Sequence, residues 1–328
     1  MTSRSPLIDS KQISVVVQGP ILPKITAQGL ESIRRFFPDA QIILSTWKNA
    51  DVQNLTFDSL VLNEDPGPIK TQAWRGSNLN RQIWSTRQGL KKVERPFCLK
   101  FRSDMQFKGT RLLNYWARFS AYNTEYKIFN ERVIICTKVT YSTARFWPGL
   151  YHPSDMIGFG RTEDILRWWQ IPLYPFENRS QFESEPVLIS DCPDHIPLDE
   201  LVPEQYIWLS SIRRSKDIIL TRNPSREDLK QDLQFLLNNF VVVEMERMDI
   251  KKLSPEELTF GPDRRLLGFS EYVYLYRKIF EKRQIQMLPV SIFRKQVLTI
   301  VAQLAPEPLK VLWRFYVKLR EALRSFGA

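Results

Sequence analysis

The chain has 328 residues, of which 43% are hydrophobic and 12% aromatic, and these side chains suffice to bury a large core. Its formal net charge is +11, and residues 261–328 alone hold 13 Lys or Arg against 5 Asp or Glu. Because the basic residues concentrate in this C-terminal segment, we expect it to face an anionic surface. The composition argues against a uniformly basic nucleic-acid-binding domain.

The N-terminal residues and the cysteines predict a cytoplasmic protein, placed peripherally on the inner face of the plasma membrane by its basic segment. Residues 1–20 lack the basic and long apolar stretches of a secretory signal, and no window reaches the roughly 18 apolar residues of a membrane span. The cysteines Cys98, Cys136 and Cys192 share no metal-ligand spacing, so we expect reduced thiols.

The N-terminal part of the chain alternates strand-like and helical segments. Short apolar or β-branched runs predict strands at 13–17, 41–45, 59–62 and 96–99. Helical spacing of apolar residues predicts helices at 27–37 and 78–92. The order strand, helix, strand, strand, helix, strand is typical of an α/β fold with a mainly parallel sheet flanked by helices.

The C-terminal part of the chain is less regular. Further strands are predicted at 133–140, 155–161 and 240–243, and further helices begin near residues 162, 203 and 228. We expect a large domain at residues 1–250 and a basic helical extension at residues 251–328. Within the extension, residues 311–326 place apolar side chains on one stripe and basic ones largely opposite. This helix either packs on the body of the protein or lies in an anionic membrane interface.

The segment LKFRSDMQF, residues 99–107, contains the first candidate for chemistry, Asp104. A carboxylate at the carboxyl end of a central strand lies where α/β sheets bind ligands and metals. Mg²⁺ and Mn²⁺ prefer carboxylate oxygens, and a diphosphate can supply the remaining ligands. Asp104 is therefore a candidate metal ligand, and the alternative is that it caps a turn or pairs with Arg102.

A second candidate is an anion site at the start of the helix predicted over 78–92. Asn78, Asn80, Arg81 and Gln82 lie where free backbone N–H groups and the helix dipole favour an anion, and Arg81 adds a charged fork. Helix capping is the alternative role for Asn78. The turn Gln18-Gly19-Pro20, after the first strand, places small residues and an amide where a nucleotide would lie.

The motifs VVVQGPI, IILSTW, NxNRQ, LKFRSDM, HPSDMIGFGRTED and PEQYIW, in this order over about residues 12–210, resemble the WavE lipopolysaccharide synthesis family of bacterial glycosyltransferase-like proteins. The resemblance implies a GT-A fold with a Rossmann-like sheet, a nucleotide-sugar donor and a divalent metal, Mn²⁺ or Mg²⁺, held by an Asp-x-Asp motif. Asp104 corresponds to the last acid of that motif. Arg102 stands at the first acid, and Ser103 lies between them beside the donor.

The resemblance also suggests catalytic residues. A transferase that inverts the anomeric centre needs a carboxylate to take the proton of the acceptor hydroxyl. Asp155 precedes a segment that resembles the acceptor-side loop, and Glu204 lies at a helix start, where the superfamily often places its base. We favour Glu204, for which the alternative is an ordinary acid in a first helical turn. His152 is a candidate distal metal ligand, with a surface histidine as the alternative.

The second strand ends in a further candidate for donor binding. Trp47 and Asp51 follow this strand in a loop that borders the nucleotide site in such folds, so they are placed to stack on and hydrogen-bond a nucleoside. Core packing is the alternative for Trp47.

These residues predict a glycosyltransferase that extends a surface glycan, namely lipopolysaccharide core, O-antigen or capsule, at the cytoplasmic membrane face. Its expected partners are a nucleotide-sugar donor, a lipid-linked or oligosaccharide acceptor and an anionic membrane bound through the C-terminal helix, with no nucleic acid. A sugar nucleotidyltransferase is a second hypothesis, but residues 18–21 lack the glycine-rich basic loop that grips a triphosphate. A third, a non-catalytic protein that binds anionic membrane or nucleic acid through its tail, leaves Asn78, Arg81 and Asp104 unexplained.

Overall fold

The computed structural model describes residues 8–69, 77–141, 150–184, 186–187, 196–254 and 266–282. Within these residues the chain forms a seven-stranded sheet of order β3-β2-β1-β4-β7-β6-β8. The strands are β1 (Ile13–Gln18), β2 (Gln41–Trp47), β3 (Ser59–Asn63), β4 (Phe97–Arg102), β6 (Val133–Cys136), β7 (Gly158–Arg161) and β8 (Phe240–Val243). β3, β2, β1 and β4 are parallel, β6 is parallel to β8, and β7 is antiparallel to both its neighbours. The predicted α/β fold with a mainly parallel sheet is confirmed.

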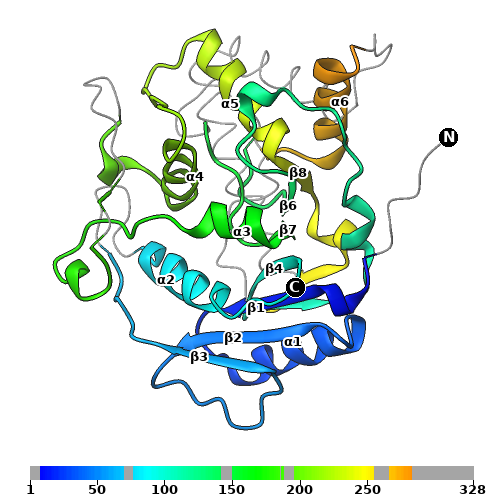
Figure 1. Ribbon diagram of the computed structural model, residues 1–328, viewed down its shortest axis with the longest axis vertical. Coiled ribbons are helices and arrows are strands. Elements are labelled where there is room, and N and C mark those ends of the chain that lie inside the picture. Colours follow the sequence, from blue (N-terminus) through cyan, green and yellow to red (C-terminus); the bar gives the residue numbers. More distant parts are fainter. Residues whose placement is uncertain are drawn as a thin grey trace, which may run out of the picture.

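Helices cover both faces of this sheet, as Figure 1 shows, with α2 and α3 on one side and α1 on the other. The described helices are α1 (Pro23–Phe36), α2 (Leu79–Leu90), α3 (Thr162–Trp169), α4 (Pro203–Arg213), α5 (Arg226–Asn239) and α6 (Phe269–Phe280). α2 lies so close to the sheet that a Cβ at Gly89 would come within 2.5 Å of the Val16 side chain. The last turn of α2 is thereby packed closely against the central strands.

The central strands are apolar on both faces because the helices cover both. Every residue of β1 is buried, as expected for a parallel strand in the middle of a sheet. A second sheet pairs β5 (Met105–Phe107) antiparallel with β9 (Ile250–Lys252). This pairing brings residues 250–254 to the end of β4, and the expected domain boundary between residues 250 and 251 falls inside β9.

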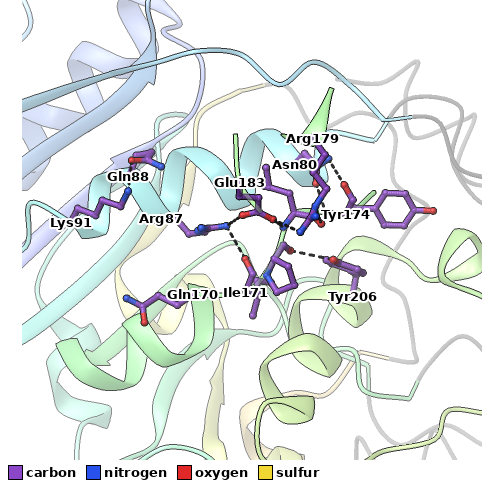
Figure 2. A network of polar contacts seen from close by, with 12 residues as sticks. Asn80, Arg87, Gln88, Lys91, Gln170, Ile171, Tyr174, Arg179, Glu183 and Tyr206 are labelled. Carbon is purple, nitrogen blue, oxygen red and sulfur yellow. Dashed lines mark hydrogen bonds and ion pairs between the residues drawn. The ribbon is translucent and has the colours of Figure 1, made fainter. Parts of the chain in front are cut away.

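A polar network connects α2 to the segment that joins α3 and α4 (Figure 2). Glu183 accepts hydrogen bonds from Arg87 of α2, from Arg179 and from the Leu173 amide. The Asn80 side chain accepts from the Tyr174 amide at 2.8 Å and donates to the Tyr174 carbonyl at 3.0 Å. These bonds fix α2 against the segment between α3 and α4.

Most predicted elements are present, with shorter strands in the C-terminal part. The strand predicted at 133–140 ends at Cys136, where the chain turns and Thr140 donates its hydroxyl to the Cys136 carbonyl at 2.7 Å. The strand predicted at 155–161 is reduced to β7, and residues 155–157 form a loop instead. The predicted basic helix at 311–326 lies outside the described residues.

Candidate functional site

A pocket of about 460 Å³ opens at the carboxyl ends of β1, β2 and β4, beside the start of α2. In the strand order, β2 and β3 extend to one side of β1 and β4 lies on the other, so the pocket is at the topological switch point of the sheet. Open α/β sheets bind their ligands at this point. The lining residues are Gln18, Gly19, Pro20, Leu22, Trp47, Asp65, Asn78, Arg81, Gln82, Arg102, Ser103, Asp104 and Ser254.

The floor of the pocket is the turn after β1. Gly19 has φ +128°, a conformation that favours glycine, and a Cβ there would come within 2.8 Å of the Ser103 hydroxyl oxygen. The Ser103 amide donates to the Gln18 carbonyl at 3.0 Å, and its hydroxyl donates to the Pro20 carbonyl at 2.7 Å. The ends of β1 and β4 are thus joined, and glycine at position 19 leaves room for the Ser103 side chain.

The first turn of α2 supplies polar groups to one wall. Arg81 donates from Nε and Nη2 to the two carboxylate oxygens of Asp65, at 2.7 and 2.6 Å, and from Nη1 to Asn78 Oδ1 at 3.0 Å. Burial acts to raise the pKa of Asp65, but the hydrogen bonds from Arg81 and the Gly67 amide, together with the charge of Arg81, outweigh it, so the pKa is lowered. The buried side-chain amide nitrogen of Gln82 has no hydrogen-bond partner within the described structure. Because Gln82 also lines the pocket, this nitrogen is placed to donate to an acceptor on a ligand.

The opposite wall is a tightly bonded group around Asp104. Arg102 donates from Nε to Oδ1 and from Nη2 to Oδ2 of Asp104, both at 2.9 Å. The Ser254 hydroxyl donates to Oδ2 at 2.7 Å, and Lys252 Nζ lies 4.0 Å from the same oxygen. Burial opposes ionisation of Asp104, but the hydrogen bonds and charge of Arg102 prevail and lower its pKa to about 2. The sequence allows Asp104 to be either a metal ligand or a residue that caps a turn or pairs with Arg102, and in the structure it pairs with Arg102.

These residues do not fit a divalent cation. Both oxygens of Asp104 accept hydrogen bonds from a guanidinium, and so do both oxygens of Asp65, while Arg102 occupies the position of the expected first acid. His152, the other predicted metal ligand, lies outside the pocket. In the part of the chain that the structure describes, no three His, Cys, Asp or Glu residues are arranged to hold a metal ion.

A second group of ionisable residues lies beside the pocket, around the first turn of α4. Glu204 Oε2 lies 3.7 Å from His152 Nε2, with only 17% of the Glu204 side chain exposed. Burial raises the pKa of Glu204 to about 8, and the Asp155 carboxylate adds to the rise. His152 Nδ1 is 2.7 Å from the Val139 carbonyl, which can only accept, so Nδ1 carries a proton and Nε2 faces Glu204.

Asp155 connects the two groups electrostatically. Its carboxylate favours the charged form of Arg102 at the pocket wall and opposes that of Glu204. Lys100, inside β4, is fully buried and donates to the Asp155 carbonyl at 2.6 Å, with its ammonium 4.7 Å from the centroid of the Trp169 ring. Burial lowers the pKa of Lys100 to about 7, although the Asp155 carboxylate acts in the opposite direction. Lys100 and Asp155 therefore link Arg102 at the pocket wall to Glu204 through electrostatic interactions.

The loop that carries His152 and Asp155 is held from α4 and α5. Gln205, next to Glu204, donates its side-chain amide to the Leu150 carbonyl at 2.7 Å. Asp232 of α5 accepts from the Tyr151 amide at 2.9 Å, where Tyr151 has φ +52°. These bonds connect the loop to both helices and position His152 beside Glu204.

The structure brings ten of the predicted donor-site and metal-site residues together in the pocket. The ten are Gln18, Gly19, Pro20, Trp47, Asn78, Arg81, Gln82, Arg102, Ser103 and Asp104. The predicted metal ligand His152 and the two predicted bases, Asp155 and Glu204, form the group at α4. Two predicted residues lie outside both groups: Asn80 is buried because its side chain pairs with Tyr174, and Asp51 is exposed and accepts from the Gln53 amide at 3.0 Å.

Sequence reasoning missed Leu22, Asp65, Lys100, Lys252 and Ser254. Asp65 follows a predicted strand just as Asp104 does, and Lys100 is a charge inside an apolar strand, so both carry a signal in the sequence. Lys252 and Ser254 have no such signal, because the pairing of β5 with β9 brings them to the site.

The fold and site define a Rossmann-like α/β protein with a polar pocket, lined by two arginines, at the carboxyl edge of its sheet. The family model described as WavE lipopolysaccharide synthesis matches residues 13–304. The chain therefore belongs to the WavE lipopolysaccharide synthesis family, which confirms the predicted family and associates the protein with lipopolysaccharide biosynthesis. No curated protein sequence matches the chain. None of the helices within the described ranges has the length and apolar character needed to cross a membrane.

Proposed function

We propose that the protein is a glycosyltransferase that moves a sugar from a nucleotide-sugar donor to a lipopolysaccharide precursor. The observation that carries this proposal is the joint arrangement of two unlike groups. A pocket with two guanidiniums and an unsatisfied amide lies at the switch point of the sheet, and a buried carboxylate of raised pKa lies beside it. A binding protein needs only the first group, whereas a transferase that inverts the anomeric centre needs both.

The donor phosphates would bind between the two walls of the pocket. Arg81 and Arg102 retain N–H groups beyond those that bond Asp65 and Asp104, and guanidiniums suit phosphate oxygens. Trp47 offers a ring at the end of β2 on which a base can stack. The sugar then points toward the side of the pocket where Asp155 and Glu204 lie.

In the proposed reaction Glu204, as a carboxylate, takes the proton of the acceptor hydroxyl while that oxygen bonds to the anomeric carbon. The bond from the anomeric carbon to the phosphate oxygen breaks, and its electron pair leaves with the nucleotide. A pKa near 8 suits a general base at neutral pH, since the group is basic and still partly ionised. The guanidiniums stabilise the charge that develops on the departing phosphate. The acceptor is lipid-linked or an oligosaccharide, and the basic C-terminal segment would hold the enzyme at an anionic membrane.

A donor screen tests the proposal. Thermal unfolding of the full chain is followed with UDP-, GDP-, CMP- and dTDP-sugars, and we expect one nucleotide to raise the melting temperature. Arg81→Gln should remove that rise, whereas Arg95→Gln, an exposed residue at the opposite end of β4, should keep it. Absence of a shift with every nucleotide-sugar would contradict the proposal. Formation of a nucleotide-sugar from a nucleoside triphosphate and a sugar phosphate would indicate the nucleotidyltransferase instead.

A further inference from the structure

We infer that Arg102, oriented by Asp104 and assisted by Lys252, supplies the positive charge that binds the donor phosphates, so that donor binding needs no divalent cation. The inference rests on the proposed function and concerns how the same pocket recognises its donor. It departs from the metal site that the Asp-x-Asp resemblance implies.

The first step of the argument is that Asp104 is committed to Arg102. The two hydrogen bonds from Nε and Nη2 engage both carboxylate oxygens in the fork geometry that guanidiniums form with carboxylates. Ser254 adds a third hydrogen bond, and the Leu253 amide donates to the Asp104 carbonyl at 2.7 Å. A metal ion would have to displace a guanidinium from a carboxylate that is only 7% exposed.

The second step is that this bonding points the remaining donors of Arg102 to the ligand. A guanidinium has five N–H groups, and the fork with Asp104 uses only those of Nε and one from Nη2. No hydrogen bond within the described structure engages Nη1 of Arg102, a residue that lines the pocket and is 35% exposed in its side chain. Asp104 is thus a positioning residue, and Arg102 is the residue that touches the phosphates.

The third step is a balance of charge. Among the residues that line the pocket, Arg81 and Asp65 neutralise each other, and so do Arg102 and Asp104, while Lys252 beside Asp104 adds a positive charge. The Asp155 carboxylate lies outside the pocket lining and acts on the buried Lys100 as well as on Arg102. The start of α2 adds the positive end of a helix dipole on the same side as Arg81. A diphosphate therefore meets a cationic site formed by the chain itself, which is the role that a bound divalent cation has in the expected scheme.

Calorimetric titration of the full chain tests the inference, with UDP, GDP, dTDP, CDP and CMP as probes, in EDTA and in Mn²⁺. We expect the nucleotide that binds to have the same dissociation constant, within about twofold, in both conditions. Arg102→Gln should weaken it about 10- to 100-fold, the usual loss for a charge-assisted hydrogen bond, and Arg102→Lys should recover part of this loss. Lys252→Gln should weaken binding about 3- to 10-fold in the same titration, whereas Arg95→Gln should not change it.

The role of Asp104 is tested by a double-variant comparison. If Asp104 acts through Arg102, adding Asp104→Asn to Arg102→Gln should weaken nucleotide binding little further, although Asp104→Asn alone weakens it. Additive losses would contradict the positioning role. If variants at Arg102 do not fold, Lys252→Gln still tests the inference. Nucleotide binding that Lys252→Gln does not weaken would count against it.

Two results would overturn the inference in different ways. If a nucleotide binds only with Mn²⁺, and if Asp104→Asn abolishes binding of Mn²⁺ alone measured by electron paramagnetic resonance, Asp104 is a metal ligand and the proposed function remains. If no nucleotide binds in either condition, the proposed function fails together with the inference.

Discussion

Replacing Glu204 by Gln should make the folded protein more stable at alkaline pH while it removes glycosyl transfer. Folding raises the pKa of Glu204 from 4.5 to about 8 through burial and the nearby Asp155. Stability from this group is complete below the unfolded pKa of 4.5 and is lost as the pH rises through about 8. Gln has nearly the same shape and never ionises, so it avoids the loss.

The magnitude follows from the two pKa values. The difference corresponds to a loss of about 5 kcal/mol above pH 8, and about 3 kcal/mol at neutral pH, if no other charge responds. Relaxation of the structure and water penetration around a buried charge offset part of this loss. We therefore expect Glu204→Gln to raise the free energy of unfolding by about 1–3 kcal/mol near pH 8, with the gain vanishing toward acid pH.

Urea unfolding across this pH range measures the gain, and a coupled transfer assay measures activity. Loss of a general base should reduce turnover about 10²- to 10⁴-fold, with donor affinity unchanged within about threefold. In the parent chain, turnover should rise with pH up to about 8. The matched control is Glu227→Gln, an exposed acid at the same position of the first turn of α5, which should shift stability by less than about 0.5 kcal/mol. A Glu204→Gln variant that is less stable at every pH, or that transfers sugar normally, would refute the reasoning.

Three further predictions concern stability and the membrane. A Cβ at Gly29 would meet the Met105 carbonyl oxygen at 2.5 Å, so Gly29→Ala should lower the free energy of unfolding by about 1–3 kcal/mol in chemical unfolding. The control Gln28→Ala, at an exposed position, should change it little, and a Gly29→Ala variant that is more stable than the parent chain would contradict this packing. Because the folded pKa of Asp104 is lowered from 3.8 to about 2, its ionisation should contribute about 2 kcal/mol at neutral pH, lost as the pH falls from about 4 toward 2. Asp104→Asn should therefore destabilise the protein at neutral pH and much less in acid, and a pH-independent difference would refute this. A chain that ends at Pro306 should sediment less with anionic vesicles than the full chain, and equal sedimentation would reject the membrane role of the basic segment.

The fold could be predicted because its main signals are local. The all-buried run of β1 and the helical spacing of α2 are properties of short segments, and their alternation fixes a parallel α/β sheet. The antiparallel β7 and the pairing of β5 with β9 could not be predicted, because they depend on contacts between distant segments. Ser254, 150 residues from Asp104 in the chain, enters the site only through that pairing.

The sequence predicts the site residues that lie at strand ends. It does not predict membership of the site where this depends on the direction in which a side chain points. Gln18 and Arg102 follow from the position of their strands alone. Asn80 and Arg81 are neighbours on one helix, yet Arg81 faces the pocket and Asn80 faces Tyr174, because successive helical residues point about 100° apart. Among the acids after the strands, Asp65 rather than Asp51 reaches the pocket.

The central claim is tested most directly by mass spectrometry of a lipopolysaccharide precursor incubated with the full chain and the nucleotide-sugar that the donor screen identifies. The account predicts that the acceptor gains the mass of one sugar while one nucleotide is released. It also predicts that Arg81→Gln removes both donor binding and the mass gain, whereas Glu204→Gln removes the mass gain alone. An acceptor that gains no mass although donor binds the parent chain, or a gain that persists in both variants, would contradict the claim.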